Sequence, residues 1–348
     1  MLRFRATPRA LCAGVAFFLG MNAGRLGAAE SVPPASPETD IAIRFVPPST
    51  TDPAIKTFNQ PHRIYVRTAT APATAANPAP SRGELLLWLP GTMPAPNDAV
   101  ADPTVTKEGA AAFCTLAAQM GYDVISLRYP NALSASAARR DEPNEFEHFR
   151  MAIIAGGTSK YITVGRIDSI EHRLRALLRY LGVHYPAEGW PGYLNQDGSI
   201  RWEKIAVAGQ SQGGGHAALI ATRHRVARVI CTGAPKDFNL RLAAPAAWLA
   251  AESATPRRRY FTFNHRQDRQ AATFAQQLQN LHAMKLDAFG GPVDVDRTPP
   301  PFQHSRILTT DYPGGTIDSN TAHTAVITWR NAAVFAPVWL YMLTASVD

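Results

Sequence analysis

The sequence contains little cysteine and no apolar run of transmembrane length. Of its three cysteines, Cys12 lies in a segment that we expect to be removed. Cys114 and Cys231 are expected on a helix and at a strand end, as two separate buried thiols rather than a disulfide. The longest apolar segment, Ala10 to Met21, is too short to cross a bilayer of about 30 Å, so no stable membrane span is expected.

Signals for nucleic-acid binding, metal binding and repeats are also absent. The formal net charge is +8, but no basic stripe is interleaved with aromatic residues, so we expect no nucleic-acid partner. No ligand spacing such as His-Glu-x-x-His occurs, so the sequence predicts neither a metal nor another cofactor. No internal repeat is found. These absences argue against metalloproteins, repeat proteins and nucleic-acid-binding proteins.

Residues 1–29 have the three parts of a secretory signal peptide. Basic residues precede the apolar segment, and Leu26 to Ala29 offers small residues for cleavage before Glu30. Removal of this segment takes away four arginines and no acids, which lowers the formal charge from +8 to +4. We therefore expect an exported protein, periplasmic or secreted.

The remaining chain is expected to form one domain. Residues 30–40 form a Pro-rich N-terminal lead, and no linker divides residues 41–348, which are enough for one large α/β core. A second biased segment, 68–81, is rich in Ala, Pro and Thr and is expected to be a surface loop. Two long loop excursions are expected at 130–165 and 236–258.

Short apolar strands alternate with helices along this domain. The main predicted strands are 41–45, 62–68, 84–89, 122–127, 205–208, 227–232, 260–264 and 306–310. The spacing predicts helices over 107–120, 166–181 and 272–284, and one closing helix over 323–343. Asp168 and Glu171 predict the start of the second helix, and Gly182 its end. The alternation predicts the α/β class, with a mostly parallel sheet of about eight strands, helices on both faces, and ligand chemistry at the carboxyl ends of the strands.

The segment Gly209-Gln210-Ser211-Gln212-Gly213 follows an apolar strand and precedes a helix-compatible run. A serine hydroxyl is a weak nucleophile, so it must project from a sharp turn toward a base. Gly209 and Gly213 carry no Cβ, which allows the turn to close. About one chain in ten of this length would contain Gly-x-Ser-x-Gly by chance. The strand and helix around it favour the catalytic interpretation, with Ser211 as the nucleophile.

Together with the strand before Pro90-Gly91-Thr92 and a later acid and histidine, this elbow makes residues 40 to 345 resemble the α/β-hydrolase superfamily. In that superfamily the nucleophile, the acid and the histidine follow one another along the chain. The glutamine after the serine is similar to the elbow of cutinases and several bacterial lipases. The resemblance implies an α/β-hydrolase fold and a secreted bacterial serine esterase or lipase.

The resemblance also implies the other members of a catalytic triad. Asp268 follows the second strand after the elbow, and His323 lies on the segment after the last strand. His323 would take the proton of Ser211, and Asp268 would orient the imidazole ring and stabilise its protonated form. Asp237 is the alternative acid, because it follows the preceding strand and some members of the superfamily take their acid from there.

The oxyanion of the implied reaction is expected to be held by two backbone amides. Superfamily members use the amide after the nucleophile, here that of Gln212, and one from the turn after the earlier strand. In that turn we choose Thr92, with Met93 as its alternative. Pro90 stands where many members of the superfamily carry a histidine before the glycine.

Several other residues have two interpretations. His216 and His265 flank the motifs and are expected in packing or supporting roles, whereas His304 precedes the last strand and is expected on the surface. The segment around Trp248, 243–251, either covers an acyl pocket or forms an ordinary buried helix. The excursion 129–160 is either a lid or a structural flap.

The favoured function is hydrolysis of carboxylic esters through a Ser-His-Asp triad and an acyl-enzyme intermediate. The substrate would be a small-molecule, lipid or polymer ester. Two alternatives remain at this point. An acyltransferase would use the same triad with an alcohol in place of water, and a non-catalytic binding protein would use the scaffold alone.

Overall fold

The computed structural model describes residues 41–67, 81–93 and 109–348. The predicted signal peptide, the lead at 30–40 and nearly all of the predicted loop at 68–81 lie outside the described residues. None of the helices within the described ranges is long and apolar enough to cross a membrane. The two cysteines of this part of the chain, Cys114 and Cys231, are both buried thiols.

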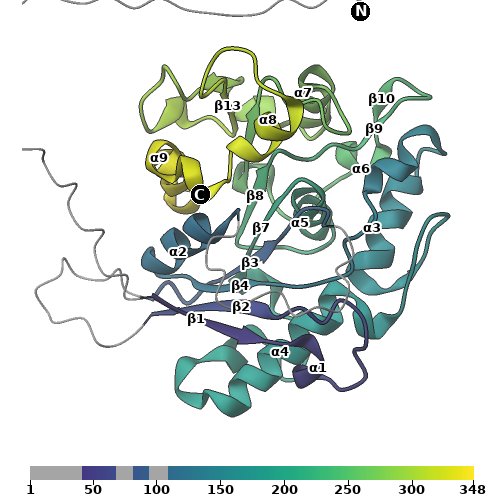
Figure 1. The fold of residues 1–348 in the computed structure, drawn as a ribbon, viewed down its shortest axis with the longest axis vertical. Coiled ribbons are helices and arrows are strands. Elements are labelled where there is room, and N and C mark those ends of the chain that lie inside the picture. Colours follow the sequence, from purple (N-terminus) through teal and green to yellow (C-terminus); the bar gives the residue numbers. More distant parts are fainter. Residues whose placement is uncertain (1–40, 68–80, 94–108) are drawn as a thin grey trace, which may run out of the picture. The chain divides into compact units, whose positions relative to one another are not determined.

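In the described part of the chain, one sheet has nine strands in the order β1-β2-β4-β3-β7-β8-β11-β13-β12 (Figure 1). Their bounds are Ile41–Val46 for β1, His62–Arg67 for β2, Leu85–Leu89 for β3, Asp123–Ser126 for β4, Ile205–Gln210 for β7, Arg228–Thr232 for β8, Tyr260–His265 for β11, Val293–Asp294 for β12 and Ile307–Thr310 for β13. Only the pairs β1/β2 and β2/β4 among these are antiparallel. The architecture confirms the predicted α/β-hydrolase fold class, with nine strands instead of about eight.

Apolar side chains of the central strands alternate between two cores. In β3, Leu85, Leu87 and Leu89 face one core and Leu86 and Trp88 the other, because successive side chains of a strand point to opposite faces of the sheet. Helices α3 (Glu145–Ala155), α4 (Ile170–His184) and α5 (Gln212–Arg223) cover the first face. Helices α2 (Ala111–Gln119) and α9 (Ala332–Thr344) cover the second. Both faces are thus buried, as the nearly continuous apolar strands require.

The carboxyl ends of the parallel strands lie at one edge of the sheet. Leu89 at the end of β3 pairs with Gly209 of β7, and Gln210 pairs with Thr232 at the end of β8. On the other side of β8, Thr232 pairs with Phe263 of β11. The turns that follow these strands therefore meet at this edge. The turn after β3 contains the expected oxyanion donor Thr92, the turn after β7 is the elbow at Ser211, and the loop after β11 contains the predicted acid, Asp268.

Helix α4 begins and ends differently from the prediction. Its cap is Ser169, whose hydroxyl accepts from the His172 amide, whereas the Asp168 carboxylate pairs with Arg173. Gly182 does not end the helix, which continues to His184. A Cβ on Gly182 would lie 2.8 Å from Cγ of Pro191, so this glycine is needed for close packing rather than for a C-terminal cap.

The single closing helix predicted at 323–343 is wrong. The structure has helix α8 (Ser319–Ala325), a short 3-10 turn, and then α9. Thr328 between them has an extended backbone, and the Asn331 side chain donates to the Ala325 carbonyl over 3.0 Å. His323 therefore lies inside a short helix that Asp318 caps by accepting from two backbone amides.

The remaining elements lie mainly in the two predicted excursions. The first contains a 3-10 turn (Ala135–Arg140), α3, and the hairpin β5 (Gly157–Thr158) and β6 (Thr163–Val164). The second contains the pair β9 (Phe238–Asn239) and β10 (Ala244–Pro245), followed by α6 (Ala247–Ala250). Helix α7 (Phe274–Ala283) begins with a capping box and corresponds to the helix predicted at 272–284. The short helix α1 (Pro48–Thr51) follows β1.

Candidate active site

Ser211 has a strained backbone at the turn between β7 and α5. Its φ and ψ are 56° and −119°, a region that residues with a Cβ rarely adopt. The Ser211 amide donates to the Thr232 carbonyl of the neighbouring strand over 2.9 Å, which holds the turn in place. The side chain is half-buried. This is the backbone geometry that a nucleophile elbow requires.

The two elbow glycines lie in close backbone contacts. A Cβ on Gly209 would lie 2.4 Å from the Gly213 carbonyl carbon. A Cβ on Gly213 would lie 1.9 Å from the Leu89 oxygen at the end of β3. Any larger residue at either position would push α5 away from the sheet, so the glycines permit the close approach that the sequence predicted.

The structure brings Asp268 and His323 together. The His323 Nδ1 lies 2.8 Å from the Asp268 Oδ2, and the other oxygen, Oδ1, accepts from the Gln270 amide over 2.9 Å. Burial opposes ionisation of Asp268, but its interactions with His323 and Lys236 outweigh burial and hold the pKa of the carboxyl below its usual range. A charged Asp268 fixes the ring tautomer with the proton on Nδ1, which leaves Nε2 unprotonated and able to accept a proton.

The environment of His323 favours a neutral ring. Burial lowers the pKa of His323, the positive charge of Lys236 lowers it further, and Asp268 opposes both. Gly233, with φ of +56°, lies against the ring, because a Cβ there would be 3.2 Å from Cε1 and Nδ1. The ring is therefore confined between the turn after β8 and the loop after β11.

The interpretation of the sequence missed Lys236. It is 7% exposed, and its Nζ donates to Asp268 Oδ2 over 2.5 Å and to the Gln270 carbonyl over 2.8 Å. The same Nζ lies 3.0 Å from His323 Nδ1. One signal was present in the sequence, because Lys236 follows β8 at the same edge of the sheet as the elbow and the acid.

Gln210 lies next to the outer nitrogen, Nε2, of the His323 imidazole. Its side-chain Nε2 lies 3.0 Å from Nε2 of His323, where the Ser211 hydroxyl would have to bind for proton transfer. The amide oxygen of Gln210 faces the turn after β3, because it would lie 2.4 Å from a Cβ on Gly91. In this structure the histidine therefore bonds to the residue before the nucleophile.

Asp237, the alternative acid, binds a different partner. Its two oxygens accept from the Arg150 guanidinium over 2.6 and 2.5 Å, and the Trp248 indole donates to Oδ2 over 2.9 Å. All three side chains are at most 2% exposed. Arg150 also donates to the Gln212 carbonyl over 2.9 Å. This buried pair connects α3 to the elbow, and Trp248 is buried beside it.

The expected oxyanion donors lie on either side of the elbow. The Gln212 amide begins helix α5, where the first backbone N–H groups have no partner within the helix. A Cβ on Gly91 would lie 3.2 Å from Ser211 Cβ, so the turn after β3 borders the serine. The Thr92 hydroxyl donates to Gln212 Oε1 over 3.1 Å. The Met93 amide donates to the Asn131 carbonyl over 3.2 Å, which favours Thr92 over Met93 as the second donor.

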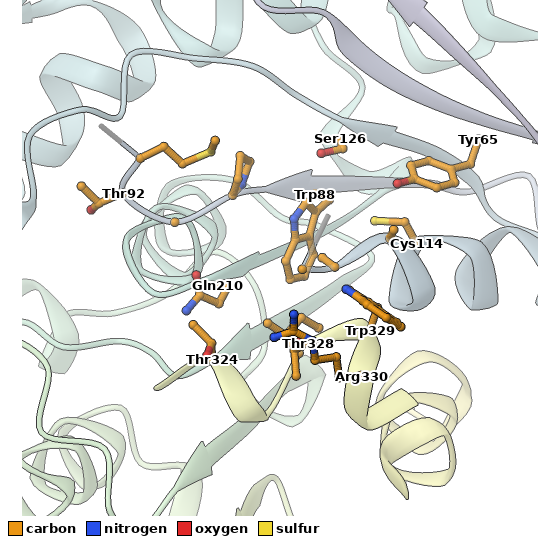
Figure 2. A pocket seen from close by; sticks show the side chains of 17 residues that line it. Tyr65, Trp88, Thr92, Cys114, Ser126, Gln210, Thr324, Thr328, Trp329 and Arg330 are labelled. Atoms are coloured by element: carbon orange, nitrogen blue, oxygen red, sulfur yellow. The ribbon is translucent and has the colours of Figure 1, made fainter. Parts of the chain in front are cut away.

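A pocket of about 430 Å³ opens beside the oxyanion turn. Figure 2 shows Thr92, Gln210 and Thr324 toward one end of its lining and Tyr65 and Cys114 toward the other. Its walls come from the end of β3, the start of α2 and the segment after α8. Apolar and aromatic side chains such as those of Trp88 and Ile327 form much of the lining.

Three other histidines that the sequence pointed to, His265, His216 and His304, have different surroundings. His265 is fixed by the Gln267 amide at Nδ1 and the Tyr312 carbonyl at Nε2. His216 is fully buried against Tyr129, and His304 is exposed before β13. Within residues 41–67, 81–93 and 109–348, no group of three or more His, Cys, Asp or Glu side chains is arranged to hold a metal.

No protein-family model and no curated protein matches the sequence. Among solved structures, the chain is similar to an inhibited esterase B from Lactobacillus rhamnosis at 15% identity and a TM-score of 0.42, covering 89% of this chain and 87% of that one. It is also similar to a putative dienelactone hydrolase from Klebsiella pneumoniae subsp. pneumoniae at 11% identity and a TM-score of 0.41, covering 88% and 99%. The case for a reaction therefore depends on the geometry of this chain's own residues.

Proposed function

We propose that this protein is a serine hydrolase that cleaves carboxylic esters through an acyl-enzyme intermediate. One observation carries the proposal. Ser211 has a strained backbone on the turn between β7 and α5, at the sheet edge where His323 is bonded to Asp268. A strained serine beside a buried Asp–His pair is the arrangement that nucleophilic acyl transfer needs.

The proposed mechanism uses each group in one role. Nε2 of His323 takes the hydroxyl proton as Ser211 attacks the acyl carbon, and it returns the proton to the leaving alcohol. Asp268 holds the ring and stabilises the imidazolium. The amides of Gln212 and Thr92 donate to the oxyanion of the tetrahedral intermediate. Water then attacks the acyl-enzyme with His323 again acting as the base.

The pocket beside Thr92 and Gln210 is the proposed binding site for one side of the ester. Its volume of about 430 Å³ falls in the range of small-molecule sites, and its apolar walls suit a hydrocarbon group. We propose a small-molecule ester with a short or medium chain as the substrate. Preference for a long-chain lipid or a polymer is the alternative outcome of the test below.

Export remains part of the proposal, because residues 1–29 lie outside the described residues. The support is the basic, apolar and small-residue order of that segment in the sequence. Expression of the full chain in a bacterium, with mass spectrometry of the product from the periplasm and the medium, tests it. A product that begins at Glu30 supports export, and an intact Met1 product in the cytoplasm contradicts it.

The activity is tested with p-nitrophenyl esters from acetyl to long acyl groups. We expect the wild type to hydrolyse the short and medium esters, and Ser211→Ala and His323→Ala to lose activity by several orders of magnitude. Ser199, a half-buried serine whose hydroxyl accepts from Asn195 and donates to Asp197, offers a matched control as Ser199→Ala. Equal rates for the wild type and Ser211→Ala would contradict the proposal.

A further inference from the structure

Lys236 is a buried lysine at the centre of the candidate site. The preceding carbonyl, that of Pro235, accepts from Asn280 of helix α7 over 3.1 Å, which fixes the segment after β8. Lysine is rarely buried unless it is paired. Here its Nζ donates to the Asp268 carboxylate and to the Gln270 carbonyl, so two turns of the sheet edge are joined through one ammonium group.

The ammonium group and the imidazole share one oxygen atom. Both Lys236 Nζ and His323 Nδ1 lie within hydrogen-bond distance of Asp268 Oδ2, and they are 3.0 Å from each other. Because Nδ1 donates its proton to Asp268, the ammonium group cannot also donate to Nδ1. Lys236 therefore acts on His323 through its charge and through the position of the carboxylate.

We propose that Lys236 is a positioning residue of the active site, which holds the Asp268 carboxylate against His323 and keeps the imidazole neutral down to lower pH than Asp268 alone would allow. The proposal rests on the proposed function, because it describes how the base of that reaction stays ready to accept a proton. Its chemical basis is repulsion between the ammonium group and an imidazolium at this short distance.

The charges around the pair agree with this role. Burial lowers the pKa of Lys236 to about 8, and Asp268 opposes the shift, so Lys236 is charged below pH 8. Burial and then Lys236 lower the pKa of His323. Other ionisable groups lie at this edge: His265 interacts with Asp268, Asp237 is paired with Arg150, Arg266 is paired with Asp311, and Asp318 caps the helix of His323. Removal of the Lys236 charge should therefore raise the pKa of His323.

The first test compares the pH profiles of kcat/KM for the wild type, Lys236→Met and Lys236→Arg. Methionine keeps a long unbranched side chain without charge, and arginine keeps the charge. We expect the acidic midpoint to rise by about one pH unit in Lys236→Met and to stay near that of the wild type in Lys236→Arg. A folded Lys236→Met protein with reduced kcat and an unchanged midpoint would mean that Lys236 only holds the loop, and would overturn the proposal.

A second measurement does not need turnover. NMR titration of the His323 ring, assigned by its loss in His323→Ala, should give a higher pKa in Lys236→Met than in the wild type. If the wild type hydrolyses no ester, the proposed function fails while this titration still decides the role of Lys236. If Lys236→Met does not fold, Lys236→Gln takes its place, because it also removes the charge. A ring pKa no higher in the folded uncharged variant than in the wild type would contradict the proposal.

Discussion

At the scale of single residues, the Gln210 amide and the Ser211 hydroxyl would each have to bind the same atom, Nε2 of His323. The Gln210 amide lies 3.0 Å from Nε2, while the proposed reaction requires the Ser211 hydroxyl there. Proton transfer therefore requires the amide to move, and Gln210 also lines the pocket that a substrate would enter. A substrate group that displaces the amide would release the base for Ser211.

Replacement of Gln210 by alanine should accelerate the reaction of Ser211 with a fluorophosphonate. A net hydrogen bond is worth about 1 kcal/mol, so its removal should raise the labelling rate about five-fold. Gln210→Glu is the matched control, because a carboxylate of the same size would bind the imidazolium and slow labelling. Slower labelling of Gln210→Ala would show instead that the amide orients the histidine productively.

Substitution of the two candidate acids, Asp268 and Asp237, should have different effects on activity and stability. Asp268→Asn should lower kcat/KM by roughly 10⁴ in the folded protein, because it disturbs the tautomer of His323. It should also lower the free energy of unfolding, because the buried Lys236 loses its counter-charge. Asp237→Asn should lower the free energy of unfolding by about 3 to 5 kcal/mol, because it leaves the buried Arg150 without its counter-charge. Urea denaturation and ester hydrolysis on both variants separate these effects. A stable but inactive Asp237→Asn would make Asp237 the acid.

At the scale of elements, the contact between helix α5 and strand β3 sets the geometry of the proposed oxyanion site. Gly213 lies against the Leu89 and Pro90 carbonyls, so the first turn of α5 reaches the turn that carries Thr92. Arg150 of α3 reinforces the same elbow from the other side through the Gln212 carbonyl.

Gly213→Ala should separate α5 from the end of β3. A Cβ would lie 1.9 Å from the Leu89 oxygen, and overpacking of this kind costs about 1 to 3 kcal/mol. Displacement of one oxyanion donor should lower kcat by about 10² to 10³. Gly192→Ala is the control, because a Cβ there meets nothing within 4 Å. Unchanged kcat in Gly213→Ala would mean that this contact does not set the site.

The strands and turns that were predicted best are those that a short local sequence pattern determines. The apolar strands and the Ser211 turn follow from apolar runs and glycine spacing within a few residues. The break in the helix before α9 depends on the hydrogen bond from the Asn331 side chain to the Ala325 carbonyl. The glycine at position 182 is required by its close contact with Pro191. Lys236 reaches Asp268 and His323 across 32 and 87 positions of the chain. Such contacts form only when the folded sheet brings the carboxyl ends of its strands together. A short stretch of sequence therefore cannot reveal them.

At the scale of the whole molecule, buried histidines should make stability depend on pH. His62 and His216 are fully buried, and burial holds the pKa of each well below its usual value. Below the unfolded pKa of about 6.5, the unfolded chain binds protons that the folded chain excludes. Stability from these groups is therefore complete above pH 6.5 and falls as the pH is lowered.

Urea denaturation at pH 7.5 and 5.5 measures this effect. At one pH unit below the unfolded pKa each of these two histidines accounts for about 1.4 kcal/mol, so the two together should lower the free energy of unfolding by about 3 kcal/mol. Burial also lowers the pKa of His323 and of His265, which adds to the drop. In His62→Gln the drop should be smaller than in the wild type by about 1.4 kcal/mol. Equal stability of the wild type at the two pH values would contradict the assignment of two buried neutral rings.

The most direct test of the account is the site of covalent labelling by a fluorophosphonate on the folded protein. Digestion and mass spectrometry should find the phosphonyl group on Ser211, and the label should be absent in Ser211→Ala and strongly slowed in His323→Ala. Failure of the wild type to react, or a label on another residue while Ser211 stays unmodified, would contradict the assignment of Ser211 as an activated nucleophile.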